Sequence, residues 1–279
     1  MPAPPHIPGY ELLTRLGGGP MTEVFAARDA DADTPCAVKT LRADWEDEAT
    51  AVKLLQREAR VGLCVRHPRL VRLLDAHVTC PPWFLVLELL PGESLRRRLR
   101  RDYRLPPADA VRVARQAAEA LAALHRDGFV HGDVKPDNLQ AGPDGAVTLL
   151  DLGFGHRVGE NAAFLREGYV LGTASYLAPE LCAPEPTEDL RSDLFSLGVT
   201  LFELLTGRLP YPPGSVSQTV RRHIDAPPDD VREHAAGVPA ALATLVARLL
   251  APRPEDRPRA SAVVQHLIRL EIAALRRSA

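Results

Sequence analysis

Apolar residues in the first ninety positions fall into short runs typical of β-strands. The segments YELLTRL, TEVFAARD, CAVKTL, LVRLLDAHV and WFLVLELL are rich in apolar and β-branched residues. One helical stretch interrupts them at about 46–65, where Leu54, Leu55, Ala59 and Leu63 recur near helical spacing. This part of the chain therefore predicts a small, sheet-rich lobe with one main helix.

The pattern changes after PGES at 91–94, a turn cluster that we interpret as a hinge. The next helix is expected at 106–128, because it opens with proline and closes with glycine. The segment 192–207 is apolar on nearly every side, which predicts a buried central helix. Further helices are expected from residue 239 onward, whereas 151–180 shows little periodicity and reads as a long functional loop.

Composition excludes several classes of protein. With 46% hydrophobic and 25% charged residues and a net charge of −2, the chain is typical of globular proteins and gives no reason to expect a nucleic-acid partner. No secretory pattern opens the chain, and no apolar run approaches the roughly 18–20 residues of a membrane span. The four cysteines lack zinc spacing, so we expect reduced core cysteines and a cytoplasmic location.

Lysine is rare in this sequence. Only Lys39, Lys53 and Lys135 among the 34 basic residues are lysines, and all others are arginines. Ammonium and guanidinium groups are not interchangeable at a crowded site, so each lysine is a candidate for a specific role.

Two segments of the first lobe carry candidate chemistry. In LGGGPMTEVF, Gly17, Gly18 and Gly19 could let backbone N–H groups approach an anion, although three glycines are also common in a plain hairpin turn. In CAVK, strand alternation places Ala37 and Lys39 on one face. Glu58 on the following helix could pair with Lys39, or both could be ordinary surface charges.

The segment HGDVKPDN at 131–138 carries further candidates. Asp133 could accept a proton from a hydroxyl group. Asn138, together with Asp151 at the end of the apolar run LLDLG, offers oxygen ligands of the kind that magnesium prefers.

The order and spacing of these segments resemble the eukaryotic-type, or Hanks-type, serine/threonine protein kinases, in their bacterial form. The resemblance runs from about residue 9 to about 270 and includes the glycine loop, CAVK, the helix glutamate, HGDVKPDN, DLG, GTASYLAPE, SDLFSLGVTLFELLTG and PEDRP. It implies one kinase domain over 1–279 with an α+β, two-lobed fold. We expect a small antiparallel-sheet lobe at about 9–90, a hinge at about 88–94 and a larger, mainly helical lobe at about 95–270.

The resemblance also implies a role for each motif residue. Asp133 would be the catalytic base, Lys135 and Lys39 would contact phosphate groups, and Glu58 would hold Lys39. Magnesium, or manganese in its place, would be held by Asn138 and Asp151. The Glu180–Arg257 ion pair would anchor the substrate loop, and Asp193 would support the catalytic loop. ATP would be held by Leu16, Gly17, Gly18, Gly19, Val24, Ala37, Lys39, Glu88, Leu90 and Gln140.

The sequence departs from the family pattern at several positions. Gly132 replaces the arginine that binds a loop phosphate in relatives, and residues 154–171 contain no serine or threonine, with Tyr169 as their only hydroxyl. These two departures favour a kinase that does not depend on phosphorylation of this loop. Thr22 stands at the third loop glycine, and Gln140 stands where an apolar residue usually lines the adenine pocket.

The prediction is a serine/threonine protein kinase that uses ATP and magnesium and acts on a protein substrate, and the sequence predicts no particular oligomeric state. One alternative is a small-molecule phosphotransferase of the aminoglycoside or choline kinase type, which shares HGD and the asparagine but generally lacks Lys135 and GTASYLAPE. The other alternative is a pseudokinase that serves as a binding module. Two of the three lysines, Lys39 and Lys135, stand at the positions that contact phosphate groups in the family, and this argues against a pseudokinase.

Overall fold

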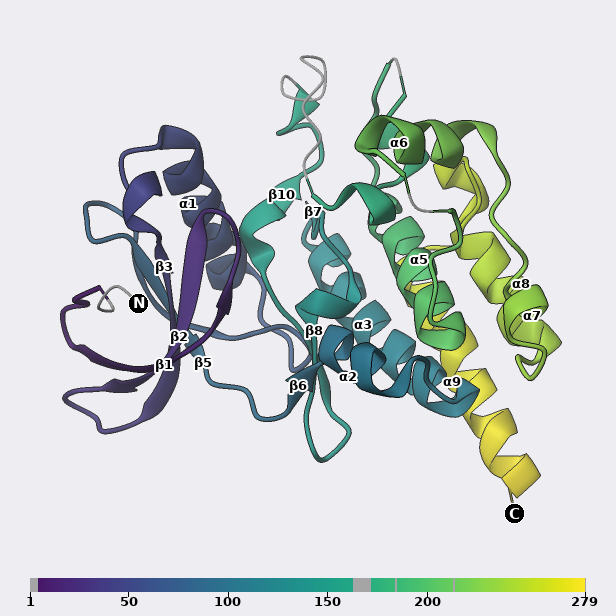
Figure 1. Ribbon diagram of the computed structural model, residues 1–279, viewed down its shortest axis with the longest axis horizontal. Coiled ribbons are helices and arrows are strands. Elements are labelled where there is room, and N and C mark those ends of the chain that lie inside the picture. Colours follow the sequence, from purple (N-terminus) through teal and green to yellow (C-terminus); the bar gives the residue numbers. More distant parts are fainter. Residues whose placement is uncertain (1–4, 163–171, 184, 213, 279) are drawn as a thin grey trace. The chain divides into compact units, whose positions relative to one another are not determined.

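The computed structural model describes residues 5–162, 172–183, 185–212 and 214–278. Contacts divide the chain into two compact units, shown in Figure 1. Unit 1 comprises Met1–His67, Val71–Pro91 and Asp151–Gly153. Unit 2 comprises Pro68–Leu70, Gly92–Leu150 and Phe154–Ala279. Each unit has its own core.

Unit 1 is built on a five-stranded antiparallel sheet. The strand order is β1-β2-β3-β5-β4, and each neighbouring pair is antiparallel. Each of the five strands overlaps the apolar run that predicted it, and β1 and β3 extend beyond their runs: β1 (Tyr10–Gly18), β2 (Thr22–Asp29), β3 (Pro35–Leu41), β4 (Leu73–His77) and β5 (Phe84–Glu88).

One helix of unit 1, α1 (Ala49–Cys64), packs against this sheet, and it contacts β4 and β5. Leu55 and Ala59 are buried as expected, but Leu63 is 64% exposed because it lies on the outer face of the last turn. The expectation of core cysteines was also wrong in part. Cys36 is buried in the sheet, whereas Cys64 and Cys80 are exposed, and all four cysteines are free.

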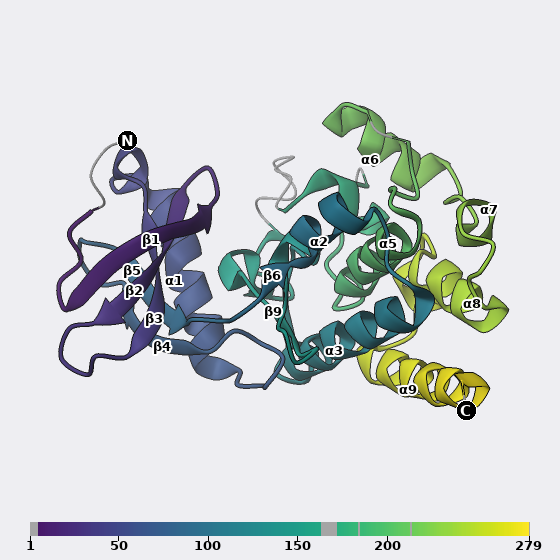
Figure 2. The ribbon, with the colours of Figure 1, turned by 60° about the horizontal axis from the view of Figure 1, so that its bottom comes forward.

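Unit 2 is mainly helical around α5 (Ser192–Thr206), all of whose residues are buried. The helix α3 (Pro107–Arg126) packs on α5 and runs beside α9 (Ala260–Ser278), as Figure 2 shows. The other α-helices among the described residues of unit 2 are α2 (Leu95–Asp102), α6 (Val216–Asp225), α7 (Val231–His234) and α8 (Ala240–Leu249). An antiparallel sheet in one unit and a helical core in the other confirm the predicted α+β fold class.

Short strands in unit 2 border the loops that carry the candidate residues. β6 (Glu93–Ser94), β8 (Leu139–Ala141) and β9 (Val147–Leu149) form one small sheet. β7 (Phe129–Val130) pairs antiparallel with β10 (His156–Arg157). The segment 131–138 therefore begins at the end of one small sheet and runs into another.

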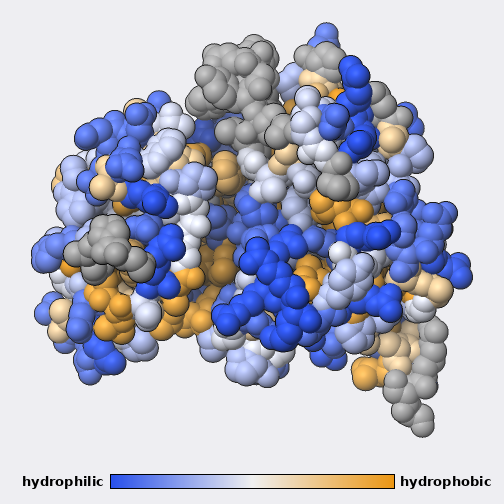
Figure 3. All heavy atoms as spheres, viewed as in Figure 1, coloured by the Kyte–Doolittle hydropathy of each residue, from blue (hydrophilic) through white to orange (hydrophobic). Residues whose placement is uncertain are grey.

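The surface of unit 2 is strongly hydrophilic over α2 (Figure 3). This helix buries Leu95 and Leu99 and exposes Arg97, Arg100 and Arg101. Among the described residues, no helix is both long and apolar enough to cross a membrane.

Candidate active site

Lys39 is the centre of a buried ionic cluster in unit 1. Strand alternation in β3 turns Cys36 and Val38 toward one core and Ala37 and Lys39 toward the opposite face. The Nζ atom of Lys39 lies 2.6 Å from Oε2 of Glu58 and 2.6 Å from Oδ1 of Asp151. The Lys39 and Glu58 side chains are only 8% and 3% exposed. The predicted ion pair is therefore present, and it is buried.

The electrostatics of this cluster favour a charged lysine. Burial alone would lower the pKa of Lys39, but the adjacent Asp151 and Glu58 carboxylates outweigh burial and raise it. Burial raises the pKa of Glu58, and the nearby Asp151 carboxylate adds to this effect, whereas Lys39 and the N–H of Leu152 offset it only in part. The Oε1 atom of Glu58 has no hydrogen-bond partner among the described atoms. The lysine is thus held as a cation in a fixed position.

The glycine segment forms the turn between β1 and β2. Gly17 lies opposite Val24, and the N–H of Gly19 donates to the carbonyl of Thr22 over 3.0 Å. Gly18 has φ +150°, and a Cβ atom there would lie 2.4 Å from the Thr22 carbonyl oxygen. A side chain at this position would collide with the turn. Leu16, just before the glycines, is 55% exposed.

The segment after β5 carries the candidate adenine contacts. The N–H of Glu88 donates to the carbonyl of Arg72 over 3.0 Å, and the Glu88 side chain accepts from the N–H of Arg72 over 2.8 Å. The carbonyl of Glu88 and the backbone of Leu90 are the groups that the sequence predicts to bond a base.

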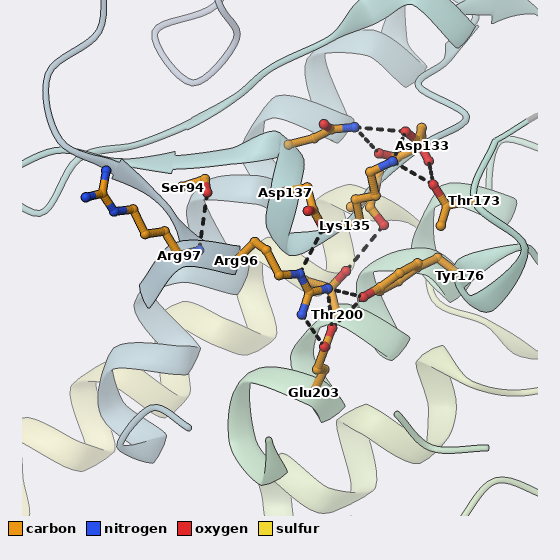
Figure 4. A network of polar contacts seen from close by, with 12 residues as sticks. Ser94, Arg96, Arg97, Asp133, Lys135, Asp137, Thr173, Tyr176, Thr200 and Glu203 are labelled. Atoms are coloured by element: carbon orange, nitrogen blue, oxygen red, sulfur yellow. Dashed lines mark hydrogen bonds and ion pairs between the residues drawn. The ribbon is translucent and has the colours of Figure 1, made fainter. Parts of the chain in front are cut away.

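In unit 2, Asp133 is surrounded by donors (Figure 4). The Nζ atom of Lys135 lies 2.6 Å from its Oδ2 atom, and the hydroxyl of Thr173 donates to Oδ1 over 2.7 Å. Lys135 also donates to the Thr173 oxygen over 2.6 Å. The lysine and the threonine, which are 38 residues apart, therefore fix both carboxylate oxygens. The contact between Thr173 and Asp133 had no local signal in the sequence.

Asn138 is locked beside Asp133. Its Nδ2 atom donates to the backbone carbonyl of Asp133 over 2.8 Å and to Oδ2 over 3.0 Å. Both amide protons are directed at Asp133, so the Oδ1 atom of Asn138 points away from it and is oriented as an oxygen ligand. Gln140, two residues on, lies on β8 opposite Thr148.

Asp193, at the start of α5, binds the backbone of the loop that carries Asp133. Its carboxylate accepts from the N–H of His131 over 2.8 Å and from the N–H of Gly132 over 2.9 Å. The Nε2 atom of His125 lies 2.9 Å away. Burial would raise the pKa of Asp193, but His125 and His131, the latter partly through its N–H, outweigh burial and lower it. Asp193 thus holds the backbone next to Asp133, as expected.

The structure gives a steric reason for Gly132. This residue has φ +81°, and a Cβ atom there would lie 3.0 Å from the carbonyl oxygen of Phe154. A Cβ atom on Gly172 would lie 2.6 Å from the carbonyl oxygen of Gly132. The two glycines therefore let the loop of Asp133 and the segment of Thr173 approach closely.

Two ionic groups hold the neighbouring segments, and the first of them is buried. Arg257 donates from its two terminal nitrogens to Glu180 over 2.7 Å each, which is the predicted pair. The second group was not predicted, and Figure 4 shows it. Arg96 donates to Glu203 over 2.6 Å, to the hydroxyl of Tyr176 over 2.6 Å and to Asp137 over 3.1 Å.

The residue set suits a metal only in combination with a ligand that brings further oxygens. No group of three or more His, Cys, Asp or Glu side chains in the described part of the chain is placed to hold a metal by itself. Asp151 in unit 1 and Asn138 in unit 2 supply hard oxygen donors. Each is a donor of the type that magnesium uses when several phosphate oxygens complete its coordination.

Comparison with known proteins identifies the family of this chain. Residues 10–268 match the protein kinase domain family. The chain is 34% identical over 262 residues to serine/threonine-protein kinase PknB of Mycobacterium leprae, which covers 92% of this chain and 42% of that protein. It is 34% identical over 248 residues to serine/threonine-protein kinase PknL of Mycobacterium bovis, covering 89% of this chain and 62% of that protein. With serine/threonine-protein kinase PrkC of Bacillus subtilis it shares 29% identity over 248 residues, or 89% of this chain and 38% of that protein.

The chain therefore spans less than two thirds of the length of each of these relatives. The family match nevertheless takes in most of its residues. This chain belongs to the protein kinase domain family.

Proposed function

We propose that this chain is a serine/threonine protein kinase that transfers the γ-phosphoryl group of ATP to hydroxyl groups of proteins, with magnesium as cofactor. The observation that carries the proposal is the contact network of Asp133, in which Lys135, Thr173 and Asn138 fix a carboxylate at the end of a supported loop. Family membership supports the use of ATP and a divalent metal.

The proposed reaction assigns one atom of Asp133 as the proton acceptor. The Oδ2 atom already accepts from Lys135 and Asn138, whereas Oδ1 accepts from Thr173. A carboxylate oxygen has two acceptor positions, so Oδ1 keeps one for the substrate hydroxyl. The hydroxyl oxygen forms a bond to the γ-phosphorus, the bond from this phosphorus to ADP breaks, and the hydroxyl proton passes to Oδ1.

The charged residues of both units have complementary tasks in this proposal. Lys39 holds a positive charge for the α- and β-phosphates, and Glu58 fixes its position. Lys135 places a second compact charge beside the transferred group. Asn138 and Asp151 would hold magnesium, which neutralises phosphate charge when bound, and manganese would serve in its place.

We propose that the residues predicted from the sequence to hold ATP contact its phosphates and its adenine. The backbone of Gly17, Gly18 and Gly19 would cover the phosphates, because no side chains obstruct it. The adenine would contact the Glu88 carbonyl and the backbone of Leu90. Its faces would meet the side chains of Leu16, Val24, Ala37 and Gln140.

We also infer that activity does not require phosphorylation of the loop after Gly153. The inference rests on the missing serine and threonine residues in 154–171 and on Gly132, which carries no side chain to bind a phosphate. Tyr169 lies outside the described residues. A Tyr169→Phe variant should keep wild-type activity, and abolished activity in this variant would overturn the inference.

Transfer of radiolabel from γ-labelled ATP with magnesium tests the proposed function. The substrates are the protein itself and a generic basic protein, and the labelled amino acids are identified after hydrolysis. Asp133→Asn should abolish label on serine and threonine, while Asp144→Asn, an exposed aspartate in the turn between β8 and β9, should leave it unchanged.

Other outcomes would contradict the proposal in distinct ways. Nucleotide binding without transfer to protein, but with transfer to a small alcohol or amine, would indicate a small-molecule phosphotransferase. Nucleotide binding without transfer to any acceptor would indicate a pseudokinase. A cytoplasmic location stays a prediction.

A further inference from the structure

A buried ion pair in unit 2 lies outside the residues assigned so far. The Nε2 atom of His156, on β10, lies 3.1 Å from Oε1 of Glu188, and the two side chains are 10% and 5% exposed. At this distance the two side chains form an ion pair when the imidazole carries a proton on Nε2 as well as on Nδ1. The other carboxylate oxygen, Oε2, accepts from the N–H of Gly159, and the N–H of Asn161 also bonds this carboxylate.

The geometry favours a charged imidazole. The Nδ1 atom of His156 lies 2.8 Å from the carbonyl oxygen of Phe154, which is an acceptor only. Both ring nitrogens therefore face acceptors, and both are satisfied only when both carry protons. Burial lowers the pKa of His156, but Glu188 and the Phe154 carbonyl raise it above its ordinary value. Burial raises the pKa of Glu188, but His156 and the two backbone N–H groups lower it.

This pair connects the segment after Gly153 to the loop of Asp133. His156 and Arg157 pair with Val130 and Phe129 of β7, and the loop 131–138 follows β7 directly. Arg157 strengthens the same junction, because its guanidinium lies 4.4 Å from the ring centroid of Phe129 and donates to the carbonyl of Asp127 over 3.1 Å. Whatever fixes His156 therefore also fixes the start of the catalytic loop.

A small cavity lies beside His156 and Glu188, and the groups around the Glu188 carboxylate resemble an anion-binding site. A cavity of about 30 Å³, room for one or two water molecules, is lined by Gly132, Phe154, His156, Asn161, Glu188 and Asp193, among others. Gly132 adds no side chain to this space, and a Cβ atom there would lie in tight contact with Phe154. The Glu188 carboxylate pairs with the His156 imidazolium and accepts hydrogen bonds from two backbone N–H groups. Such a set of donors forms an anion site of the type that also binds phosphate.

We propose that Glu188 and His156 form a permanent ionic clasp that positions the residues after Gly153 and the loop of Asp133 for phosphoryl transfer. Glu188 supplies, from the segment after Glu180, the negative charge that a modified hydroxyl would otherwise bring to residues 154–171. Both residues are positioning residues. The proposal rests on the proposed kinase function and names what orders its catalytic loop.

Four variants of the full chain test the clasp: Glu188→Gln, His156→Gln, the double variant, and the control Glu185→Gln. Glu185 is exposed and lies three residues before Glu188, so the control removes the same charge from the same segment. The readouts are kcat and KM for a protein substrate, and the hydrogen-exchange rates of the amides of Gly159 and Asn161.

We expect Glu188→Gln to lower kcat about tenfold, because a misplaced catalytic loop costs rate more than substrate affinity. The exchange of the two amides should accelerate about tenfold, and Glu185→Gln should change neither quantity. The double variant should lose no more than the worse single variant, because the residues act as one pair. If Glu188→Gln does not fold, His156→Gln must show the same two effects.

Wild-type kcat together with wild-type exchange in Glu188→Gln would overturn the clasp, and so would fully additive losses in the double variant. The exchange measurement needs no turnover. If the wild-type chain proves inactive on every substrate, faster exchange in Glu188→Gln but not in Glu185→Gln still supports the clasp, and equal exchange refutes it.

Discussion

The ammonium group of Lys39 lies 2.6 Å from the carboxylate of Glu58, and both side chains are buried within unit 1. The pair joins β3 to α1 across 19 residues of sequence. Buried pairs of this kind cost desolvation energy, and their value lies in the fixed position that they give to a charge.

Replacing Lys39 with methionine should lower the free energy of unfolding by about 3 kcal/mol near pH 8, because Glu58 would remain buried without a cation. The loss should shrink toward pH 5. Burial already raises the pKa of Glu58, and without Lys39 this carboxyl takes up a proton in the folded state. Urea unfolding at both pH values measures the effect. Lys53→Met, at an exposed position of α1, is the matched control, and an equal loss in both variants would contradict the prediction.

The clasp of His156 and Glu188 should stabilise unit 2 in a defined pH window. The folded-state pKa of His156 is raised, so its contribution is complete below the ordinary value of 6.5 and is lost as the pH rises through the folded-state value. The folded-state pKa of Glu188 is lowered, so its contribution is complete above the ordinary value of 4.5. The groups that face His156 are Glu188, the more distant Asp193 carboxylate and the carbonyl of Phe154.

The difference in free energy of unfolding between wild type and His156→Gln should therefore be largest between pH 4.5 and 6.5 and should decline at higher pH. Thermal unfolding across pH 5–9 checks this. A difference that grows steadily with pH would contradict the charged state of His156.

Arg257→Lys should destabilise the protein by about 3 kcal/mol, although the charge is kept. The guanidinium makes two parallel bonds to Glu180 and also donates to the carbonyls of Ala251 and Pro252. An ammonium cannot reproduce this fork. Arg253→Lys, whose side chain is 72% exposed, should change the midpoint of urea unfolding little, and similar midpoints for the two variants would show that geometry is unimportant here.

Gly132→Ala should cost more stability than Gly145→Ala. The two glycines have φ values of +81° and +80°, so both alanines pay the same backbone cost of about 1 kcal/mol. A Cβ atom on Gly145 meets nothing within 4 Å, whereas one on Gly132 meets Phe154. We expect an extra loss of about 1 kcal/mol for Gly132→Ala from this contact, seen in the free energy of unfolding. Equal losses would mean that Phe154 moves aside freely.

The sequence predicted those parts of the structure that local patterns encode. Strand alternation placed Ala37 and Lys39 on one face, and the apolar run at 192–207 predicted the buried helix α5. The Lys39–Glu58 and Glu180–Arg257 pairs were predicted because both members belong to recognisable motifs.

Contacts between motifs and unremarkable segments escaped prediction. Glu188 lies in a segment without periodicity, and His156 lies on a strand of only two residues. No sequence pattern therefore predicted the contact between them. Arg96 was hidden among the many arginines of α2. The exposed Leu63 and Cys64 show the converse error, because apolar residues near the end of a helix need not face a core.

The initial rate of γ-phosphoryl transfer by protein stripped of all phosphate, compared with Asp133→Asn prepared in the same way, tests the account most directly. We predict that the wild-type chain phosphorylates serine and threonine at once, without a lag, and that Asp133→Asn transfers nothing measurable. A lag that ends as Tyr169 becomes phosphorylated, or an Asp133→Asn variant as active as wild type, would contradict it.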